Sequence, residues 1–482
     1  MTVSVAGADL RVLDLETRMP FHFGGVEVTE IPKAILELEV DLNGGVAKGT
    51  SMGGLIPGWF YKDPDMPLDV GLRNMITAFR AAVRQAGTLD PEPTAFDFWR
   101  ALYDSQREWA AGTAYPPLLW TYGVSLVEQA LIDAVCRHVN VSFVSAVHEG
   151  LLGIDLGAIY DELEPYGPSD LLPRTAERST AIRHTVGIDD PLTAADVGPG
   201  ERLADGLPQT LAEYIRSDGV NHFKIKLAAD GAADRARLAR IAEILEEHDV
   251  EEYRCTLDAN EGYDSASAFK RQWEGHAADP ALAELVDRLE YVEQPLARDD
   301  AFTRATKEVL DGWDDAPPVI IDESDDRIDS AGTAMEYGYA GTSHKNCKGV
   351  FKGIVNACLV AYRNRTETNQ RYVLSAEDLT TVGPIELLQD LAVVATVGAG
   401  HVERNGHHYF RGLDAFPEAV QETVLRAHGD LYRRHEDGFP TLDIDDGTVD
   451  LASVAEAPFG VAPLFDLDQL QPVDRWLDDL DA

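Results

Sequence analysis

The sequence predicts an α/β protein in which a small α+β unit precedes a series of alternating strands and helices. The chain has 482 residues, 45% of them hydrophobic, which is enough apolar material for two domains or for one large barrel with additions. Over residues 181–420, short apolar runs alternate with amphipathic helical patterns. Eight such units fit a modified (β/α)8 TIM barrel, which typically takes about 250 residues. A doubly wound open sheet uses the same units, and periodicity alone does not choose between the two.

Residues 1–150 show the patterns of a small α+β domain. Leu36, Leu38 and Val40 alternate with glutamates, which indicates a strand with one buried face, and Asn-Gly-Gly at 43–45 predicts the turn that follows it. Apolar residues then recur at the three- and four-residue steps of an amphipathic helix: Leu72, Met75, Ile76, Phe79 and Val83.

Residues 151–180 are rich in glycine, proline and charge, and we expect them to lead into a second domain over residues 181–420. The eight expected strands lie at 182–186, 222–227, 254–258, 289–293, 319–322, a weaker run ending near 345, 371–375 and 401–403. Helices are predicted between them, for example at 238–245 and 282–289. We expect the C-terminal segment, residues 421–482, to pack back on the first domain or on the barrel.

The charge of the chain excludes one class of function. Acidic residues outnumber basic ones by 84 to 41, which gives a formal net charge of −43. Such a surface repels phosphate backbones, so we expect no nucleic-acid partner. Because the negative charge is spread over the whole chain, the composition is typical of a halophilic protein, for which the Debye length of about 3 Å at 1 M salt screens self-repulsion.

Cysteine usage and hydropathy bear on the compartment. Cys136, Cys255, Cys347 and Cys358 form no CxxC pair and show no zinc-site spacing, so we expect reduced and mostly buried thiols. No stretch approaches the roughly 20 uninterrupted apolar residues of a membrane span, and the N-terminus carries charges where a signal peptide needs an apolar run. We therefore expect a soluble, cytoplasmic protein without a membrane partner.

Three carboxylates follow directly on predicted strands. Asp258, Glu293 and Asp322 are 35 and 29 residues apart, which is one strand–helix unit each time. At the carboxyl ends of parallel barrel strands they point into the mouth of the barrel, where they would repel one another unless a hard cation lies between them. Mg²⁺ fits because it prefers oxygen ligands, and Mn²⁺ is an alternative. The competing interpretation is that each acid is a solvated loop residue or a helix cap.

Two lysines lie on one predicted strand. Lys224 and Lys226 flank a single isoleucine, so both point to the same face. A neighbouring ammonium and a dry site both lower the pKa of a lysine, and a neutral amine is what a general base needs. The alternative is a surface pair on an edge strand. Lys345 and Lys348 form a further cationic cluster, which suits anion binding by a loop equally well.

Four of these motifs, in this order and at these spacings, resemble the enolase superfamily and within it the muconate-lactonizing and mandelate-racemase-like branch. They are Lys-Ile-Lys at 224–226, Leu-Asp-Ala-Asn at 257–260, Val-Glu-Gln-Pro at 292–295 and Ile-Asp-Glu-Ser at 321–324. Residues 21–25 with 29–32 resemble the first mobile capping loop of that family, and residues 50–54 resemble the second, which we extend to about 60.

The resemblance implies an α+β capping domain on a modified barrel, with Asp258, Glu293 and Asp322 holding Mg²⁺. It implies that Lys226 is the base that removes a proton next to a substrate carboxylate, and that Lys224 is its electrostatic partner. Lys345 is implied as the acid or base on the opposite face. Because Gly-Val-Phe-Lys-Gly at 349–353 replaces the glycine pair that usually follows this lysine, Lys348 is the alternative.

Lysines on both faces permit racemisation or epimerisation through an enediolate, which is the reaction we expect first. Dehydration of an acid sugar and cycloisomerisation pass through the same intermediate and are the alternatives. A non-catalytic barrel that binds a carboxylate ligand is the alternative of a different class. The expected partner is a small-molecule carboxylate, and members of this superfamily are commonly homo-oligomers.

Further residues are candidates for contacting the substrate, with Phe21, His22, Met52 and Trp59 closing the site from above. The complete predicted set is Asn260, Glu377, Glu403, Arg404, Asn405, His407, Phe21, His22 and Met52. The sequence lacks the paired Asp-x-Asp on the eighth strand that marks dipeptide epimerases. The competing interpretation is that the polar residues make turns and helix caps and that the aromatic ones pack in a core.

Overall fold

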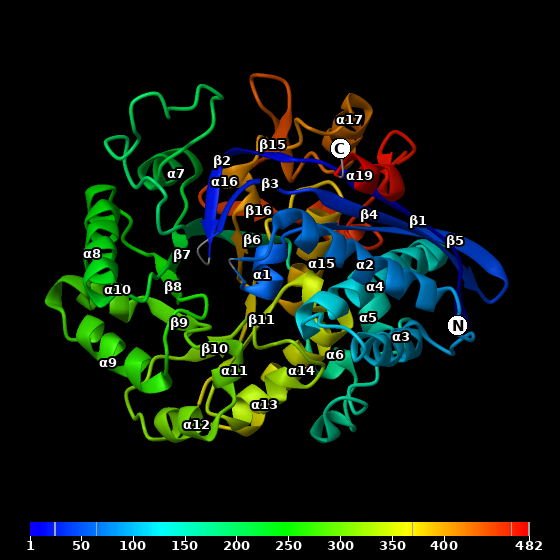
Figure 1. Cartoon of the computed structure of the whole chain (residues 1–482), viewed down its shortest axis with the longest axis horizontal. Coiled ribbons are helices and arrows are strands. Elements are labelled where there is room, and N and C mark those ends of the chain that lie inside the picture. The colour runs from blue at the N-terminus through cyan, green and yellow to red at the C-terminus, as the bar shows by residue number, and fades with distance from the viewer. Residues whose placement is uncertain (24–25, 64, 369, 464, 481–482) are drawn as a thin grey trace.

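The N-terminal part of the chain forms an antiparallel sheet at one side of the molecule (Figure 1). The computed structural model describes residues 1–23, 26–63, 65–368, 370–463 and 465–480, with only the backbone at 22, 23 and 26. The sheet has the order β17-β1-β4-β5, formed by β1 (Val3–Leu13), β4 (Lys33–Leu42), β5 (Gly45–Gly54) and β17 (Gln471–Pro472). The predicted strand and turn are confirmed, because Leu36, Leu38 and Val40 are buried in β4 and the backbone turns into β5 at residues 43–44.

Helices α2 (Leu68–Ala86), α3 (Ala95–Ala110), α4 (Pro117–Val139) and α5 (Phe143–His148) complete this cap domain. Helix α4 lies against β4 and β5 and also contacts the barrel, so it is buried nearly all round, and its sequence is largely apolar, with a few buried polar residues such as Glu128. Its approach to the sheet is so close that a Cβ atom at Gly49 would lie 2.0 Å from the carbonyl oxygen of Ala130. The hairpin β2 (Glu16–Phe23) and β3 (Val26–Glu30) and the short helix α1 (Pro57–Tyr61) extend from the cap over the barrel (Figure 1).

The second part is a closed barrel of eight parallel strands. The strands are β6 (Ser179–Val186), β7 (His222–Lys226), β8 (Arg254–Asp258), β9 (Leu289–Glu293), β10 (Val319–Ile321), β11 (Gly341–His344), β12 (Val373–Ala376) and β13 (His401–Arg404). Each strand pairs in parallel with the next, and β13 pairs back onto β6. This last pairing closes the sheet, so the capped TIM barrel is confirmed and the open doubly wound sheet is excluded.

Helices surround the barrel on its outer side (Figure 1). They are α7 (Leu211–Asp218), α8 (Gly231–Glu247), α9 (Ala266–Ala277), α10 (Ala283–Asp287), α11 (Arg298–Ala301), α12 (Arg304–Asp311), α13 (Ser330–Glu336), α14 (Val350–Thr366) and α15 (Glu386–Val397), with α6 (Pro168–Leu171) in the segment before β6 and 3-10 turns η1 (Asp161–Leu163), η2 (Pro280–Leu282) and η3 (Asn346–Lys348). The helix predicted at 238–245 lies within α8. The one predicted at 282–289 is shorter, because Leu289 already begins β9.

The C-terminal part of the chain contacts both the barrel and the cap. Its elements are α16 (Gly406–Tyr409), α17 (Glu418–Ala427), β14 (Tyr432–Arg434), β15 (Pro440–Leu442), β16 (Thr448–Asp450), α18 (Ala452–Glu456), β17 and α19 (Val473–Asp479). Strand β16 pairs antiparallel with β6 of the barrel, and β17 pairs antiparallel with β1 of the cap sheet. The last 60 residues therefore join the two parts of the fold.

All four cysteines are buried and unpaired, as the sequence predicts. Among the described residues, no helix is long and apolar enough to cross a membrane.

Candidate active site

Five acidic side chains meet inside the mouth of the barrel, each at or just after the carboxyl end of a strand. They are Asp258 on β8, Glu293 on β9, Asp322 after β10, Glu377 after β12 and Glu403 on β13, and all are buried. One oxygen each of Glu293, Asp322 and Glu377 lie within 4.8 Å of one another. Asp258 is next to this group, since its Cα pairs in register with that of Glu293. The strand-end carboxylates are therefore brought together, and Glu377 joins them.

The donor set fits a hard divalent cation. Both carboxylate oxygens of Glu293 are buried and accept no hydrogen bond from the described residues, and their only close cation is Lys224, whose Nζ atom is 2.7 Å from Oε2. Burial, together with the carboxylates of Asp258 and Glu377, raises the pKa of Glu293 well above its usual value. A divalent cation between these carboxylates would satisfy the oxygens of Glu293, and an all-oxygen set suits Mg²⁺.

Lys224 lies at the centre of the acidic group with its side chain 1% exposed. Its Nζ atom is 2.6 Å from Glu377, 2.7 Å from Glu293, 3.0 Å from Glu403 and 3.1 Å from Asp258. Burial by itself lowers the pKa of Lys224, but these four carboxylates outweigh it and hold the pKa well above its usual value. The expectation of a lowered pKa is therefore wrong for Lys224, because its nearest charged neighbours are carboxylates and not ammonium groups.

Lys226 lies two residues further along β7 and faces the same interior. Its Nζ atom is 2.5 Å from Oδ2 of Asp258 and donates a hydrogen bond of 2.8 Å to Oδ1 of Asn260. The side chain keeps 10% of its surface exposed and lines a cleft between the cap and the barrel. The lysine pair therefore occupies the barrel mouth and not an edge strand.

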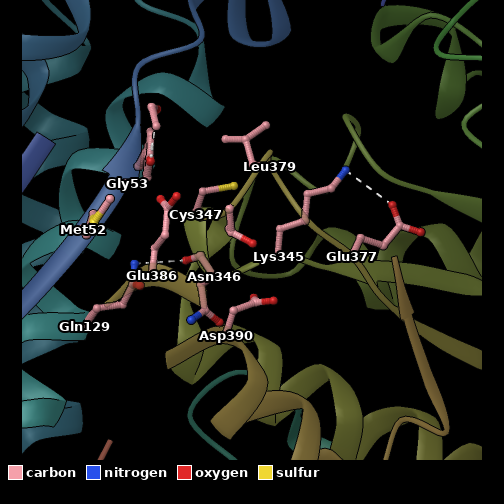
Figure 2. A pocket seen from close by; sticks show the side chains of 13 residues that line it. Met52, Gly53, Gln129, Lys345, Asn346, Cys347, Glu377, Leu379, Glu386 and Asp390 are labelled. Atoms are coloured by element: carbon pink, nitrogen blue, oxygen red, sulfur yellow. Dashed lines mark hydrogen bonds and ion pairs between the residues drawn. The ribbon is translucent and has the colours of Figure 1, made fainter. Parts of the chain in front are cut away.

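The two remaining lysines differ in what they face. Lys345 points into the cleft, 2.5 Å from Oδ2 of Asp322 and 3.4 Å from Oε2 of Glu377, with the ring of Trp59 5.1 Å from its Nζ atom. Figure 2 shows its ammonium directed at Glu377. Lys348 lies behind Asp322, bound to Oδ1 of that residue and to Oγ of Ser343, and it is not among the residues that line the cleft. This geometry favours Lys345 over Lys348 as the lysine that faces a ligand.

Residues of the cap cover the cleft and leave little free space in it. Its volume is about 30 Å³, and Phe21, Ile56, Trp59 and Leu379 form its apolar wall. A second cavity of about 20 Å³ lies behind Lys345, between the cap and barrel residues that Figure 2 labels. Volumes of this size hold about one water molecule each. A substrate therefore requires movement of the cap elements that cover the site.

The predicted substrate contacts are divided between the cleft and the second cavity, and some lie in neither. Phe21, Asn260, Glu403 and Asn405 line the cleft, together with three residues that the sequence analysis missed: Asp378, Leu379 and Thr380. Met52 and Glu377 line the second cavity. These missed residues carry no motif, and their only signal is that they follow the seventh barrel strand.

Arg404 and His407, both predicted as substrate contacts, are not among the residues that line the cleft. Side chains alternate along β13, so Glu403 points into the barrel and Arg404 points outward, where it pairs with Asp390 of α15. His407 packs against the ring of His184, with 3.2 Å between Nε2 of His407 and Nδ1 of His184. The side chain of His22 and residues 24–25 of the first predicted capping loop lie outside the described part of the structure.

A buried arginine that sequence reasoning missed supports the acidic group. Arg183, in the middle of β6, donates a hydrogen bond of 2.8 Å from Nη2 to Oε1 of Glu377 and has Nη1 2.6 Å from Nδ1 of His401. An arginine inside an apolar strand pattern was the available signal. Burial raises the pKa of Glu377, but Lys224, Lys345 and Arg183 outweigh it, and the pKa lies well below its usual value.

The architecture is similar to that of several solved structures. An enolase from Bradyrhizobium, complexed with magnesium and mandelic acid, has a TM-score of 0.59 at 15% identity over 96% of each chain. A mandelate racemase/muconate lactonizing enzyme from Bordetella bronchiseptica has a TM-score of 0.59 at 15% identity over the whole of both chains. A dipeptide epimerase from Enterococcus faecalis, complexed with Mg and the dipeptide L-Leu-L-Tyr, has a TM-score of 0.58 at 14% identity over 95% of this chain and 99% of the other.

No protein-family model matches the sequence, and no curated protein does. The similarity covers nearly the entire chain in each comparison and includes both the cap and the barrel. The chain has the capped-barrel fold of the enolase superfamily.

Proposed function

We propose that the chain is an enzyme of the enolase superfamily that uses Mg²⁺ to remove the proton α to the carboxylate of a small molecule, and that its reaction is a racemisation or epimerisation. One observation carries the proposal. Lys226 and Lys345 line the same cleft from β7 and β11, which are four strands apart in a closed barrel of eight. Strands so related lie on opposite sides of the barrel, so the two amines approach a bound substrate from opposite faces.

We assign Mg²⁺ to Asp258, Glu293 and Asp322: Glu293 and Asp322 each have an oxygen within 4.8 Å of the other and of Glu377, and Asp258 pairs in register with Glu293. When bound there, the cation neutralises part of the negative charge that develops on the carboxylate as the α-proton leaves. Lys224 would keep its positive charge at the centre of the acidic group and balance the carboxylates that the cation does not reach. The positive charges of Lys224 and the cation would lower the free energy of an enediolate formed in this buried site.

The proton transfers would be carried by the two lysines in the cleft. Lys226, oriented by Asn260, would accept the α-proton from one face while the C–H electron pair moves into the enediolate. Lys345, protonated and held between Asp322 and Glu377, would donate a proton to the same carbon from the opposite face. The configuration at that carbon is thereby inverted, and the reverse reaction exchanges the two roles.

The experiment is α-proton exchange in D₂O with Mg²⁺ and molar KCl, over a library of chiral carboxylic acids. We expect Lys226→Ala to lower the exchange rate of one enantiomer, and Lys345→Ala to lower that of the other, each by about a hundredfold or more. Lys48→Ala, an exposed position on the cap sheet, is the matched control and is expected to exchange normally. Exchange from both enantiomers at the wild-type rate in both cleft variants would refute the assignment of the two lysines.

A further inference from the structure

Helix α1 of the cap is attached to the barrel at its carboxyl end. Arg298, which begins α11, donates hydrogen bonds of 3.0 Å to the carbonyl oxygen of Phe60 and 3.3 Å to that of Trp59. These carbonyls belong to the last turn of α1, where backbone acceptors have no partner within the helix. Since Trp59 lines the cleft and covers Lys345, the position of α1 determines part of the wall around a substrate.

Arg298 is itself held by Glu261, a residue of the loop after β8. The contact is a fork in which Nε and Nη2 of Arg298 each lie 3.0 Å from a different oxygen of Glu261, and the backbone N–H of Arg298 adds a third hydrogen bond of 2.9 Å. Lys62, the residue after α1, approaches the same carboxylate at 3.4 Å. The side chain of Glu261 is 9% exposed, so solvent screens these contacts much less than it screens surface ion pairs.

The same loop holds the candidate base. Asn260, directly before Glu261, accepts the hydrogen bond from Lys226 at Oδ1 and donates from Nδ2 to Oε1 of Glu323, 3.3 Å away. The carbonyl oxygen of Asn260 accepts a hydrogen bond of 3.3 Å from Lys62, whose Nζ atom is also 3.2 Å from Glu323. Lys62 of the cap therefore contacts both Asn260, which orients Lys226, and Glu323, which accepts a hydrogen bond from Asn260.

The backbone of this loop needs such support. Asn260 has φ +43° and Glu261 has φ +68°, so two successive residues with side chains occupy the left-handed region. This conformation is uncommon for residues other than glycine and persists where surrounding contacts over-determine it. Lys62 and Arg298 supply such contacts here. Lys62 directly follows α1 in the chain, and Arg298 donates a hydrogen bond to a carbonyl oxygen of α1.

We propose that Glu261 is a positioning residue that couples closure of α1 to the orientation of Lys226. Lys62, Glu261, Arg298 and Glu323 form what we call the cap latch. When α1 is in place, the latch holds the loop at 260–261 in its left-handed conformation, and Asn260 then directs the amine of Lys226 toward the cleft. When α1 moves away to admit a substrate, the loop loses its contacts with Lys62, whereas Arg298 of the barrel stays paired with Glu261. The part of the proposal that concerns Lys226 as a base rests on the proposed function.

Hydrogen exchange of the full-length protein tests the latch without any substrate. Glu261→Gln removes the charge while keeping the shape, and we expect the amides of residues 58–62 and of 260–261 to exchange about tenfold faster than in the wild type. Glu308→Gln breaks an exposed ion pair with Arg304 on α12 and is the matched control, which should leave both segments unchanged. If Glu261→Gln fails to fold, Lys62→Met tests the same coupling from the cap. Unchanged exchange in α1, or an equal rise in the control, would overturn the proposal.

Kinetics test whether the latch acts on Lys226. For Glu261→Gln we expect KM to rise, because the Trp59 wall is displaced, and kcat for α-proton exchange to fall, because Asn260 no longer holds the amine. A rise in KM with kcat unchanged would overturn the coupling to Lys226. If the wild type exchanges no substrate proton at all, the proposed function fails, and the hydrogen-exchange comparison of residues 58–62 with 260–261 still decides whether the two segments are coupled.

Discussion

Nη2 of Arg183 donates a hydrogen bond of 2.8 Å to Oε1 of Glu377 inside the barrel, and both side chains are fully buried. The two residues belong to β6 and to the end of β12, 194 residues apart in the chain. This pair holds Glu377 so that its other oxygen contacts Lys224 and Lys345. A structural ion pair therefore supports the group that the proposed chemistry uses.

Replacement of Arg183 by methionine should destabilise the protein by about 3–5 kcal/mol, because it removes one of the three cations that face the buried carboxylate of Glu377. The measurement is urea unfolding of the wild type and the variant in the same high-salt buffer. Arg304→Met, which removes an exposed pair on α12, is the control and should cost less than about 1 kcal/mol. Equal costs for the two variants would contradict the role given to Arg183.

Mg²⁺ should stabilise the wild type and not the variant Glu293→Gln. A ligand at a hundred times its Kd adds about 2.7 kcal/mol to the free energy of unfolding when it binds only the folded state. Without Mg²⁺ the variant should be more stable than the wild type at neutral pH, because the mutation removes a buried carboxylate whose oxygens accept no hydrogen bond from the described residues. Thermal unfolding with Mg²⁺ and with a chelator measures both effects, and stabilisation of both proteins by Mg²⁺ to the same extent would refute Glu293 as a ligand.

Glu128 should make stability fall as the pH rises. Burial in α4 raises the pKa of Glu128 to about 8, whereas its pKa in the unfolded chain is about 4.3. Because Glu128 keeps its proton longer in the folded state, its contribution to stability is fully present below about pH 4.3 and declines until the pH passes about 8, by a total of about 5 kcal/mol. Glu128→Gln should remove this decline. Unfolding free energies of both proteins between pH 5 and 8 give the test, and parallel pH profiles would contradict it.

Salt should stabilise the fold. The net charge of −43 generates self-repulsion that 1 M salt, with a Debye length of about 3 Å, largely screens. We expect both the Tm and the α-proton exchange activity to rise between dilute buffer and molar KCl. A protein with the same Tm at both salt concentrations would contradict the halophilic interpretation and leave the site assignment intact.

The features that the sequence predicted well depend on local patterns. Alternation over Leu36, Leu38 and Val40 marks a half-buried strand, and apolar runs that end in Asp258 or Glu293 mark strand ends at a barrel mouth. These signals need only neighbouring residues, since strand and helix periods are set by the backbone itself. The helix predicted over 282–289 shows where the local signal is ambiguous, because a short apolar run suits both helix and strand.

By itself, the sequence determined the order of strands and helices, the carboxylates at the strand ends and the lysine pair on β7, because each of these depends on spacing along the chain. Only the tertiary structure decided that β13 pairs with β6, that Arg183 meets Glu377, and that Arg404 turns away from the cleft. It also reversed the direction of the pKa shift of Lys224, because four carboxylates from other strands surround this amine. Barrel closure brings together groups that are far apart in the chain, and the electrostatic energy of a buried charge depends on those distant neighbours.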